Sequence, residues 1–316
     1  MEYLFLAGAC FFFSVQFVFQ KLFQKYSDSS FAAAMWCALV NALFMIIFLL
    51  PNARELAGAD ATAFICSAVY SAVTVLMTLA MLIAMKGGKL SMVTSYMLLG
   101  GFILPFLWGV AVYREALVPL KIAGLALMLL CILAGALPDK KGEKKEKSQR
   151  PTASVYVACA LLFLSNGAVS IATAASQKTE NPLSSDAFLL LSLIEIAVLS
   201  LLLMLVYAAA GKIRGDAHSF KKTFVEIAAV PPMTGKLFAA LLFYCALHSL
   251  CNGAGNIFSM NCAKTMDSSL QFPVISAVVI ISGALLGRIF FKEPINKRDG
   301  AGLILATAGI VCFIAA

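Results

Sequence analysis

The sequence has too little charge for a water-soluble protein of its length. Only 13% of its 316 residues are charged and 61% are apolar, whereas a soluble globular domain carries about 25% charged residues. So little polar surface cannot cover a globular body in water, and the long apolar runs therefore indicate membrane spans. The net charge of +8 is then typical of basic cytoplasmic loops rather than of a nucleic-acid partner.

The motifs of several enzyme classes are also absent. The sequence contains no Walker motif, no H-E-x-x-H and no G-x-S-x-G, which disfavours ATP hydrolysis, zinc proteolysis and serine hydrolysis. The two histidines, His218 and His248, lie far apart, and the nine cysteines form no C-x-x-C pair, so neither a metal site nor a cofactor is predicted. We interpret the cysteines as packing residues, because all of them lie in or beside apolar segments.

Ten apolar segments are each close to the length of about 20 residues that a membrane-spanning helix needs. We therefore predict an all-α polytopic membrane protein with ten transmembrane helices. The hydrophilic residues 139–152 separate five segments from five, which predicts a first five-helix repeat over 1–138, a basic cytoplasmic linker and a second repeat over 153–316. The predicted spans are 3–23, 30–50, 62–84, 90–112, 117–137, 154–175, 187–210, 236–259, 268–291 and 299–316.

A shift of 178 residues aligns the last part of the first half with that of the second. The register holds without a gap through a helix, a short loop and the next helix, which indicates a duplication. Because five is an odd number of helices, the second copy must enter the membrane upside down, giving two inverted repeats. The matched positions are Lys86 and Lys264, Ser91 and Ser269, Gly109 and Gly287, Glu115 and Glu293, and Gly124 and Gly302.

The basic residues predict the orientation. With the N-terminus outside the cytoplasm, the cytoplasmic connections hold 19 of the 24 Lys and Arg residues, and the opposite connections hold 5. This is a strong positive-inside bias. We therefore predict a multi-pass protein of the cytoplasmic membrane with both termini on the non-cytoplasmic side.

Three stretches follow the pattern of one transporter family: FFFSVQFVFQKLF at 11–23, LWGVAVYREALVPLKIAGLALMLL at 107–130, and LLGRIFFKEPINKRDGAGLILATAGIVCF at 285–313. They resemble the EamA-like branch of the drug/metabolite transporter superfamily, although Ala116 stands where the second copy has Pro294. The resemblance implies a central cavity lined mainly by the first, third and fourth helices of each half. It also implies efflux of amino acids, amines or related metabolites, by a monomer or a homodimer.

A polar stripe runs through the apolar segment 236–259, where four side chains recur every four residues: Tyr244, His248, Asn252 and Asn256. This spacing places them on one helix face. The shift of 178 residues aligns the last three with polar residues of the third segment, namely Tyr70, Thr74 and Thr78. Because hydrocarbon leaves polar groups unsatisfied, we predict that the two stripes line a wet cavity. Gly253 and Gly255 permit close helix packing, which we favour, or a local break in the helix.

Four further polar residues are cavity candidates: Gln16, Gln20, Tyr96 and Gln271. Gln16 and Gln20 share a face of the first helix, and an amide both donates and accepts hydrogen bonds. That suits a substrate with amine and carboxylate groups, with interhelical hydrogen bonding as the alternative. Asn41 and Asn166 are mid-span groups with no evident partner in the sequence.

Two ionisable residues are candidates for proton coupling. Glu195 is the only acidic residue deep in a predicted span, and His248 lies near the centre of its own span. The alternatives are a carboxylate held by a neighbouring helix and a histidine satisfied within the core.

Glu115 and Glu293 are expected to serve in capping and pairing. The loop over 211–235 is predicted to be either an interfacial helix or a solvated loop.

These features predict a secondary transporter of small organic metabolites, such as amino acids or amines, with export favoured and proton coupling as an option. Its partners would be a small-molecule substrate and membrane lipid, and it would not be an enzyme. Two alternatives stay open. A polytopic enzyme acting on a lipid-linked substrate would gather polar residues near one membrane face, whereas those here lie mostly at mid-span depth. A non-transporting scaffold would have no central cavity.

Reporter fusions test the orientation. A C-terminal alkaline phosphatase, which is active only outside the cytoplasm, is expected to be active, because the positive-inside bias places that terminus outside. The same reporter inserted in the basic linker at 139–152 is the control and is expected to be inactive. An active linker fusion with an inactive C-terminal fusion would reverse the predicted orientation.

Overall fold

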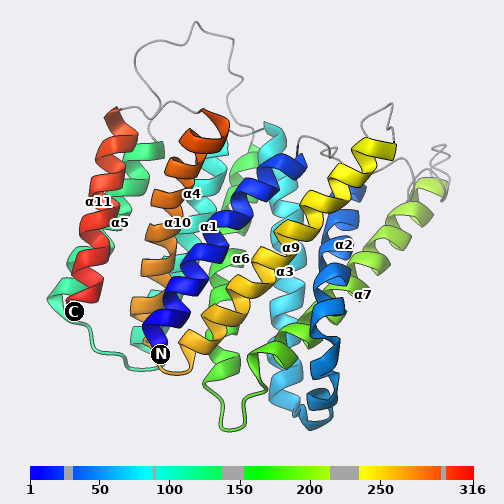
Figure 1. Cartoon of the computed structure of the whole chain (residues 1–316), viewed down its shortest axis with the longest axis horizontal. Helices are drawn as coiled ribbons and strands as arrows, with labels where there is room; N and C mark the ends of the chain where they lie inside the picture. Colours follow the sequence, from blue (N-terminus) through cyan, green and yellow to red (C-terminus); the bar gives the residue numbers. More distant parts are fainter. Residues whose placement is uncertain (25–30, 88–89, 137–152, 214–234, 293–296) are drawn as a thin grey trace, which may run out of the picture. The chain divides into compact units, whose positions relative to one another are not determined.

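The chain is helical along each of its long apolar segments. The computed structural model describes residues 1–24, 31–87, 90–136, 153–213, 235–292 and 297–316 (Figure 1). Within them lie ten α-helices: α1 (Glu2–Gln24), α2 (Phe31–Leu49), α3 (Ala61–Gly87), α4 (Leu90–Ala111), α5 (Pro119–Ala136), α6 (Ala153–Gln177), α7 (Ser185–Ile213), α9 (Gly235–Ala263), α10 (Ser268–Phe291) and α11 (Lys297–Ile314). A 3₁₀ helix, η1 (Leu50–Gly58), follows α2. Each α-helix begins and ends within a few residues of a predicted span, so the all-helical fold class is confirmed. The linker at 139–152, most of the loop at 211–235 and Glu293 lie outside the described residues.

Six described segments are long and apolar enough to cross a membrane: Glu2–Gln20, Met35–Gly58, Ala61–Met81, Ala153–Gln177, Ser185–Ala209 and Ser268–Phe291. Shorter apolar helices cover Tyr96–Ala111, Pro119–Cys131 and Gly300–Ile314. The long helix α9 is not in the first set, and it is the helix that carries the polar stripe. Length and composition therefore indicate a helical membrane protein.

The described helices form two compact units. The first unit contains residues 1–82 and 171–266, and so holds α1, α2, η1, α7, α9 and most of α3. The second unit contains residues 83–170 and 267–316, and so holds α4, α5, α10, α11 and most of α6. Each unit therefore draws helices from both halves of the sequence.

Within each unit, helices at equivalent positions of the two halves pack together. In the first unit α2, the second helix of its half, packs against α7, the second helix of the other half. In the second unit α4 packs against α10 and α5 packs against α11. The two helices of each pair are antiparallel (Figure 1).

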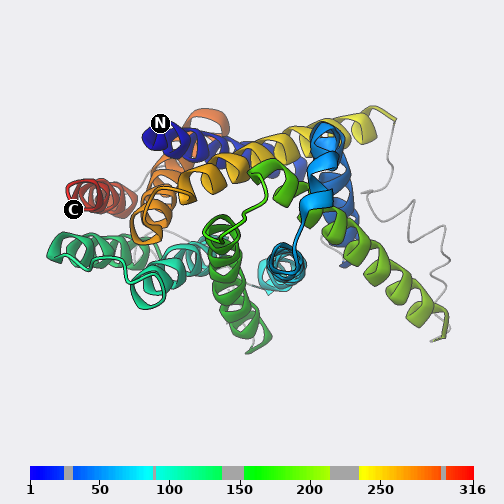
Figure 2. The ribbon, with the colours of Figure 1, turned by 90° about the horizontal axis from the view of Figure 1, so that it is seen from below.

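Close packing in the first unit depends on two glycines of α9, which lies alongside α1 (Figure 1 and Figure 2). A Cβ atom at Gly255 would overlap the ring of Phe13 on α1. A Cβ atom at Gly253 would overlap the Met45 side chain on α2. Since α9 continues without interruption through both positions, the packing role is confirmed and the alternative of a broken helix is wrong.

The second unit has a similar close approach between α5 and α11. A Cβ atom at Gly124 would lie 2.9 Å from the ring of Phe313 and 3.2 Å from the carbonyl oxygen of Gly309. The ring of Phe313 in turn meets that of Phe106 on α4 edge to face, with centroids 6.4 Å apart. These contacts give α4, α5 and α11 a common core.

The two mid-span asparagines that lacked an evident partner both have one. The Asn166 amide on α6 donates to the carbonyl oxygen of Met97 on α4 at 2.7 Å. Gly101 makes room for this contact, because a Cβ atom there would overlap the amide of Asn166. In the first unit, the Cys245 thiol donates to Oδ1 of Asn41 at 3.0 Å. Both asparagines therefore join neighbouring helices.

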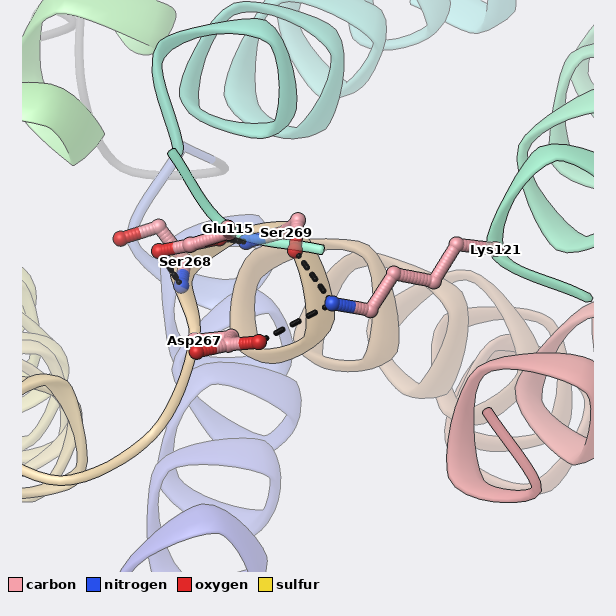
Figure 3. Close-up of polar contacts among 5 residues, drawn as sticks. All are labelled: Glu115, Lys121, Asp267, Ser268 and Ser269. Carbon is pink, nitrogen blue, oxygen red and sulfur yellow. Dashed lines mark hydrogen bonds and ion pairs between the residues drawn. The ribbon is translucent and has the colours of Figure 1, made fainter. Parts of the chain in front are cut away.

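Five residues are joined by hydrogen bonds at the N-terminus of α10 and are hereafter called the α10 clamp. They are Glu115 and Lys121, and the residues Asp267, Ser268 and Ser269 at the start of α10 (Figure 3). The Glu115 carboxylate accepts from the backbone N–H groups of Ser268 and Ser269, each at 2.8 Å. Lys121 is only 5% exposed, and its Nζ donates to Asp267 Oδ2 at 3.0 Å and to Ser269 Oγ at 2.9 Å. A helix leaves its first N–H groups unsatisfied, and its dipole favours an anion at this end. The predicted capping role of Glu115 is thus confirmed.

Two described non-glycine residues have positive φ angles, Arg114 at 55° and Lys292 at 56°. Each lies just beyond the end of a helix, α4 and α10 respectively. A left-handed residue commonly ends a helix, but it is unfavourable for a side chain with a Cβ atom. The two residues are 178 positions apart, which is the shift that aligns the two halves of the sequence.

Glu115→Ala is expected to destabilise the protein, because two N–H groups at the buried start of α10 lose their acceptor. Loss of a helix cap costs about 1–2 kcal/mol, which corresponds to a fall of a few degrees in melting temperature. Thermal unfolding in detergent, followed by circular dichroism, measures it. Glu180→Ala changes an exposed glutamate between α6 and α7 and is the matched control. Equal losses in the two variants would contradict the capping role.

Candidate functional site

Polar side chains from three helices of the first unit form one hydrogen-bonded chain, hereafter called the amide chain: Tyr70, Asn256, Asn252 and Gln16. The Tyr70 hydroxyl on α3 donates to Asn256 Oδ1 at 3.3 Å. The Asn256 amide donates to Asn252 Oδ1 at 3.1 Å, and the Asn252 amide donates to Gln16 Oε1 on α1 at 2.7 Å. Tyr70, Gln16 and Asn256 are all buried. The polar stripe of α9 therefore satisfies its hydrogen bonds with α1 and α3.

His248 also contacts Gln16 on α1. Its Nδ1 lies 3.3 Å from the backbone oxygen of Gln16. A carbonyl oxygen only accepts, so Nδ1 carries the hydrogen and the neutral ring keeps Nε2 as an acceptor. An acceptor nitrogen next to the amide chain can receive a hydrogen bond from an amine or ammonium group.

Glu195 lies near the middle of the apolar segment Ser185–Ala209 of α7, ten residues after Ser185, or about 15 Å along the helix axis. Two serines of α3 hold its carboxylate: Ser67 Oγ donates to Oε1 and Ser71 Oγ donates to Oε2, each at 2.9 Å. Ser71 Oγ also lies 2.8 Å from the backbone oxygen of Ser192. Glu195, Ser67, Ser71 and the Ser192 carbonyl are hereafter called the Glu195 site. A carboxylate held by a neighbouring helix was one of the two interpretations of this residue.

One turn of α3 joins the Glu195 site to the amide chain. Ser67 and Ser71 bind α7, while Tyr70 binds α9. The ring of Tyr70 also meets that of Phe188 on α7 edge to face, with centroids 6.1 Å apart. Residues three and four positions apart share a helix face. α3 therefore connects a carboxylate to a chain of amides within the first unit.

The remaining predicted cavity residues lie elsewhere. Tyr244 packs with α2 residues around Leu241 and Cys245 of α9. Gln20 and Thr74 are half-buried, one turn beyond Gln16 and Tyr70, and Thr74 Oγ1 has no hydrogen-bond partner in the described part of the chain. In the second unit, Tyr96 on α4 is 37% exposed, whereas Gln271 on α10 is fully buried. Four of the predicted residues, Gln16, Tyr70, His248 and Asn252, are thus in direct contact with one another or with Asn256.

Ser67 and Ser71 were missed by reasoning from the sequence. A serine within a helix commonly bonds to its own backbone, as Ser14 does to Cys10 and Ser170 does to Asn166. Their only signal is a spacing of four residues on the face that carries Tyr70. That spacing is too common among serines in apolar helices to identify carboxylate ligands.

Comparison with known proteins identifies a fold relative but no family. No family model matches the chain, and no curated protein matches its sequence. One protein of known crystal structure is similar in fold, with a TM-score of 0.66 and 14% identical residues. The match covers 98% of this chain and 95% of the chain of that protein. At that identity the likeness establishes a shared fold alone. The fold and its apolar helices define a helical membrane protein.

Asn252→Ala is expected to lower stability, because Asn252 links Gln16 to Asn256, and its loss removes the donor to Gln16 Oε1 and the side-chain acceptor of the Asn256 amide. The expected cost is about 1–2 kcal/mol. Asn261→Ala is the matched control on the same helix, since Asn261 bonds only to Ile257 and Lys264 nearby in the sequence. Thermal unfolding in detergent measures both. A larger loss for Asn261→Ala would contradict the importance of the amide chain.

Proposed function

We propose that the protein is a secondary transporter of small organic metabolites, such as amino acids or amines, which works by alternating access at a midplane cavity. The observation that carries the proposal is the Glu195 site joined to the amide chain, among helices of which α1, α3 and α7 are long and apolar enough to cross a membrane. Polar and ionisable groups within such helices are costly and typically mark substrate or ion pathways. The resemblance to the EamA-like branch makes export the proposed direction.

Duplication supports the proposed architecture of ten spans in two inverted repeats. Equivalent helices pack in antiparallel pairs, as an inverted repeat requires. The left-handed residues Arg114 and Lys292 match in the same register. In the sequence this register aligns Lys121 with Asp299 and Lys89 with Asp267, so the first half carries a cation and the second half an anion at both positions.

The α10 clamp supports the proposed topology. It brings the connection between α4 and α5 to the connection between α9 and α10. Ten alternating spans place both connections on the same membrane face, and the positive-inside bias makes that face the non-cytoplasmic one, together with both termini. An uneven number of crossings between these two connections would separate them by the thickness of the bilayer.

The amide chain suits a substrate with both an amine and a carboxylate. Gln16 receives a hydrogen bond at Oε1, which leaves its amide hydrogens as donors for a carboxylate. His248 Nε2 is the acceptor for an amine. Of the two candidates for proton coupling we favour Glu195, because hydroxyl partners can donate to a carboxylate and accept from a carboxylic acid.

Purified protein in liposomes tests the function. A panel of labelled amino acids and amines is offered with and without an imposed pH gradient, and at least one compound is expected to accumulate when the gradient is present. Glu195→Gln is expected to abolish gradient-driven accumulation and to preserve exchange of substrate across the membrane. His248→Gln is expected to raise KM roughly tenfold, as the loss of one hydrogen bond to a charged group would.

Ser200→Ala is the matched control, because Ser200 is a buried serine of α7 outside the Glu195 site. It is expected to transport as the wild type does. Accumulation that persists in Glu195→Gln would remove this residue from coupling. Movement no faster than in protein-free liposomes, for every compound in the panel, would contradict the transport function.

A further inference from the structure

Within the described residues, the Glu195 carboxylate forms no ion pair with a Lys or Arg side chain. α2, which packs against α7, contains no charged residue, and the charged residue of α3 is Lys86, far along the helix. α9 has one Lys, Lys236 near its start, and η1, which also packs against α7, has Arg54. Within the described chain, the partners of the Glu195 carboxylate are two neutral hydroxyls. An unbalanced charge at this depth is strongly disfavoured, so the site calls for a cation from solution.

The hydroxyl hydrogens of the site are fewer than the oxygens within their reach. Ser67 Oγ lies 2.9 Å from Glu195 Oε1 and 3.1 Å from the carbonyl oxygen of Phe64. Ser71 Oγ lies 2.9 Å from Glu195 Oε2 and 2.8 Å from the carbonyl oxygen of Ser192. Each hydroxyl has a single hydrogen for two acceptors. Two hydrogens therefore serve four oxygens.

This arrangement lets both serines change role without moving. If each hydroxyl turns its hydrogen to the carbonyl oxygen within its reach, its lone pairs face the carboxylate region. Ser67 and Ser71 lie one helical turn apart and flank the two carboxylate oxygens at equal distances. Four oxygens are then available to one cation, two from the carboxylate and two from the hydroxyls.

We propose that the Glu195 site binds a single Na⁺ ion, with both carboxylate oxygens of Glu195 and the hydroxyl oxygens of Ser67 and Ser71 as ligands. Oxygen ligands select hard cations over softer transition metals. One carboxylate neutralises one positive charge, whereas Ca²⁺ and Mg²⁺ carry two and are commonly held by additional carboxylates or phosphates. A proton on Glu195 requires only one carboxylate oxygen, so Na⁺ and H⁺ would compete for this carboxylate, and the like placement of the two serines is the feature that favours Na⁺. The inference rests on the proposed function in naming Na⁺ as a coupling ion of the transporter.

Binding is measured on the purified full chain in detergent, independently of transport. NaCl replaces KCl stepwise at constant ionic strength and constant pH, and the melting temperature is followed by intrinsic fluorescence. A ligand that binds only the folded state raises the apparent stability in proportion to the logarithm of its concentration above Kd. We expect the melting temperature to rise with Na⁺ and not with K⁺ or choline.

Variants assign the ligands. Glu195→Gln is expected to abolish the Na⁺ effect, and Ser67→Ala and Ser71→Ala are each expected to raise the Kd for Na⁺ about tenfold, equivalent to about 1.4 kcal/mol. Ser67→Thr and Ser71→Thr retain the hydroxyl and are expected to restore binding, which separates ligand loss from misfolding. Ser200→Ala removes a buried α7 hydroxyl that has no hydrogen-bond partner in the described residues, and it should leave Kd unchanged.

Equal responses to Na⁺ and K⁺, or a Na⁺ response that survives Glu195→Gln, would overturn the assignment. Stabilisation that follows acidification and ignores Na⁺ would also overturn it, and would leave the transport function to stand on the liposome measurements. Conversely, Na⁺ binding with the expected variant pattern supports the site even where the liposomes show no transport. The two proposals therefore fail separately.

Discussion

Hydrocarbon offers polar groups no hydrogen-bond partner, and this constraint explains most of the contacts in the first unit. α9 carries three asparagines and a histidine along its length. Asn252 and Asn256 bond to Gln16 on α1 and to Tyr70 on α3, His248 bonds to the backbone of α1, and Asn261 bonds to Ile257 and Lys264 nearby. Glu195 obtains its partners from the same turn of α3. The polar side chains therefore link α9 to α1 and α3, and α7 to α3.

The first N–H groups of a helix also lack a hydrogen-bond partner within the helix. In the second unit, the α10 clamp supplies an acceptor for two of these N–H groups of α10. Ser268 and Ser269 are buried, so water does not serve their N–H groups. A carboxylate satisfies both groups at once and complements the helix dipole. Gly109 is needed for this, because a Cβ atom there would overlap the Glu115 carboxylate. The connection after α4 thereby determines where α10 begins.

Local patterns in the sequence predicted the helices and the faces they present, and long-range pairings escaped them. The bounds of α10 matched the predicted span because an apolar run of that length has one stable form in a membrane. The spacing of the stripe placed His248 and Asn252 on one face, as the structure has them. Nothing local indicates that Ser67 meets a carboxylate 128 residues away, or that Lys121 meets Asp267 across 146 residues. Such partners depend on which helices pack together in the folded protein. The sequences of two separate apolar segments do not show whether those segments pack together.

The composition of the two units also constrains any mechanism of alternating access. The two sequence halves are the predicted inverted repeats, yet each compact unit contains helices from both halves. The antiparallel pairs α2 with α7, α4 with α10 and α5 with α11 all lie within a unit. A motion of one half against the other would have to separate all three pairs and would break the Glu195 site and the α10 clamp. A motion that preserves these contacts must keep each unit intact, and it must be absorbed where the chain passes between units, within α3, within α6 and at the connection between α9 and α10.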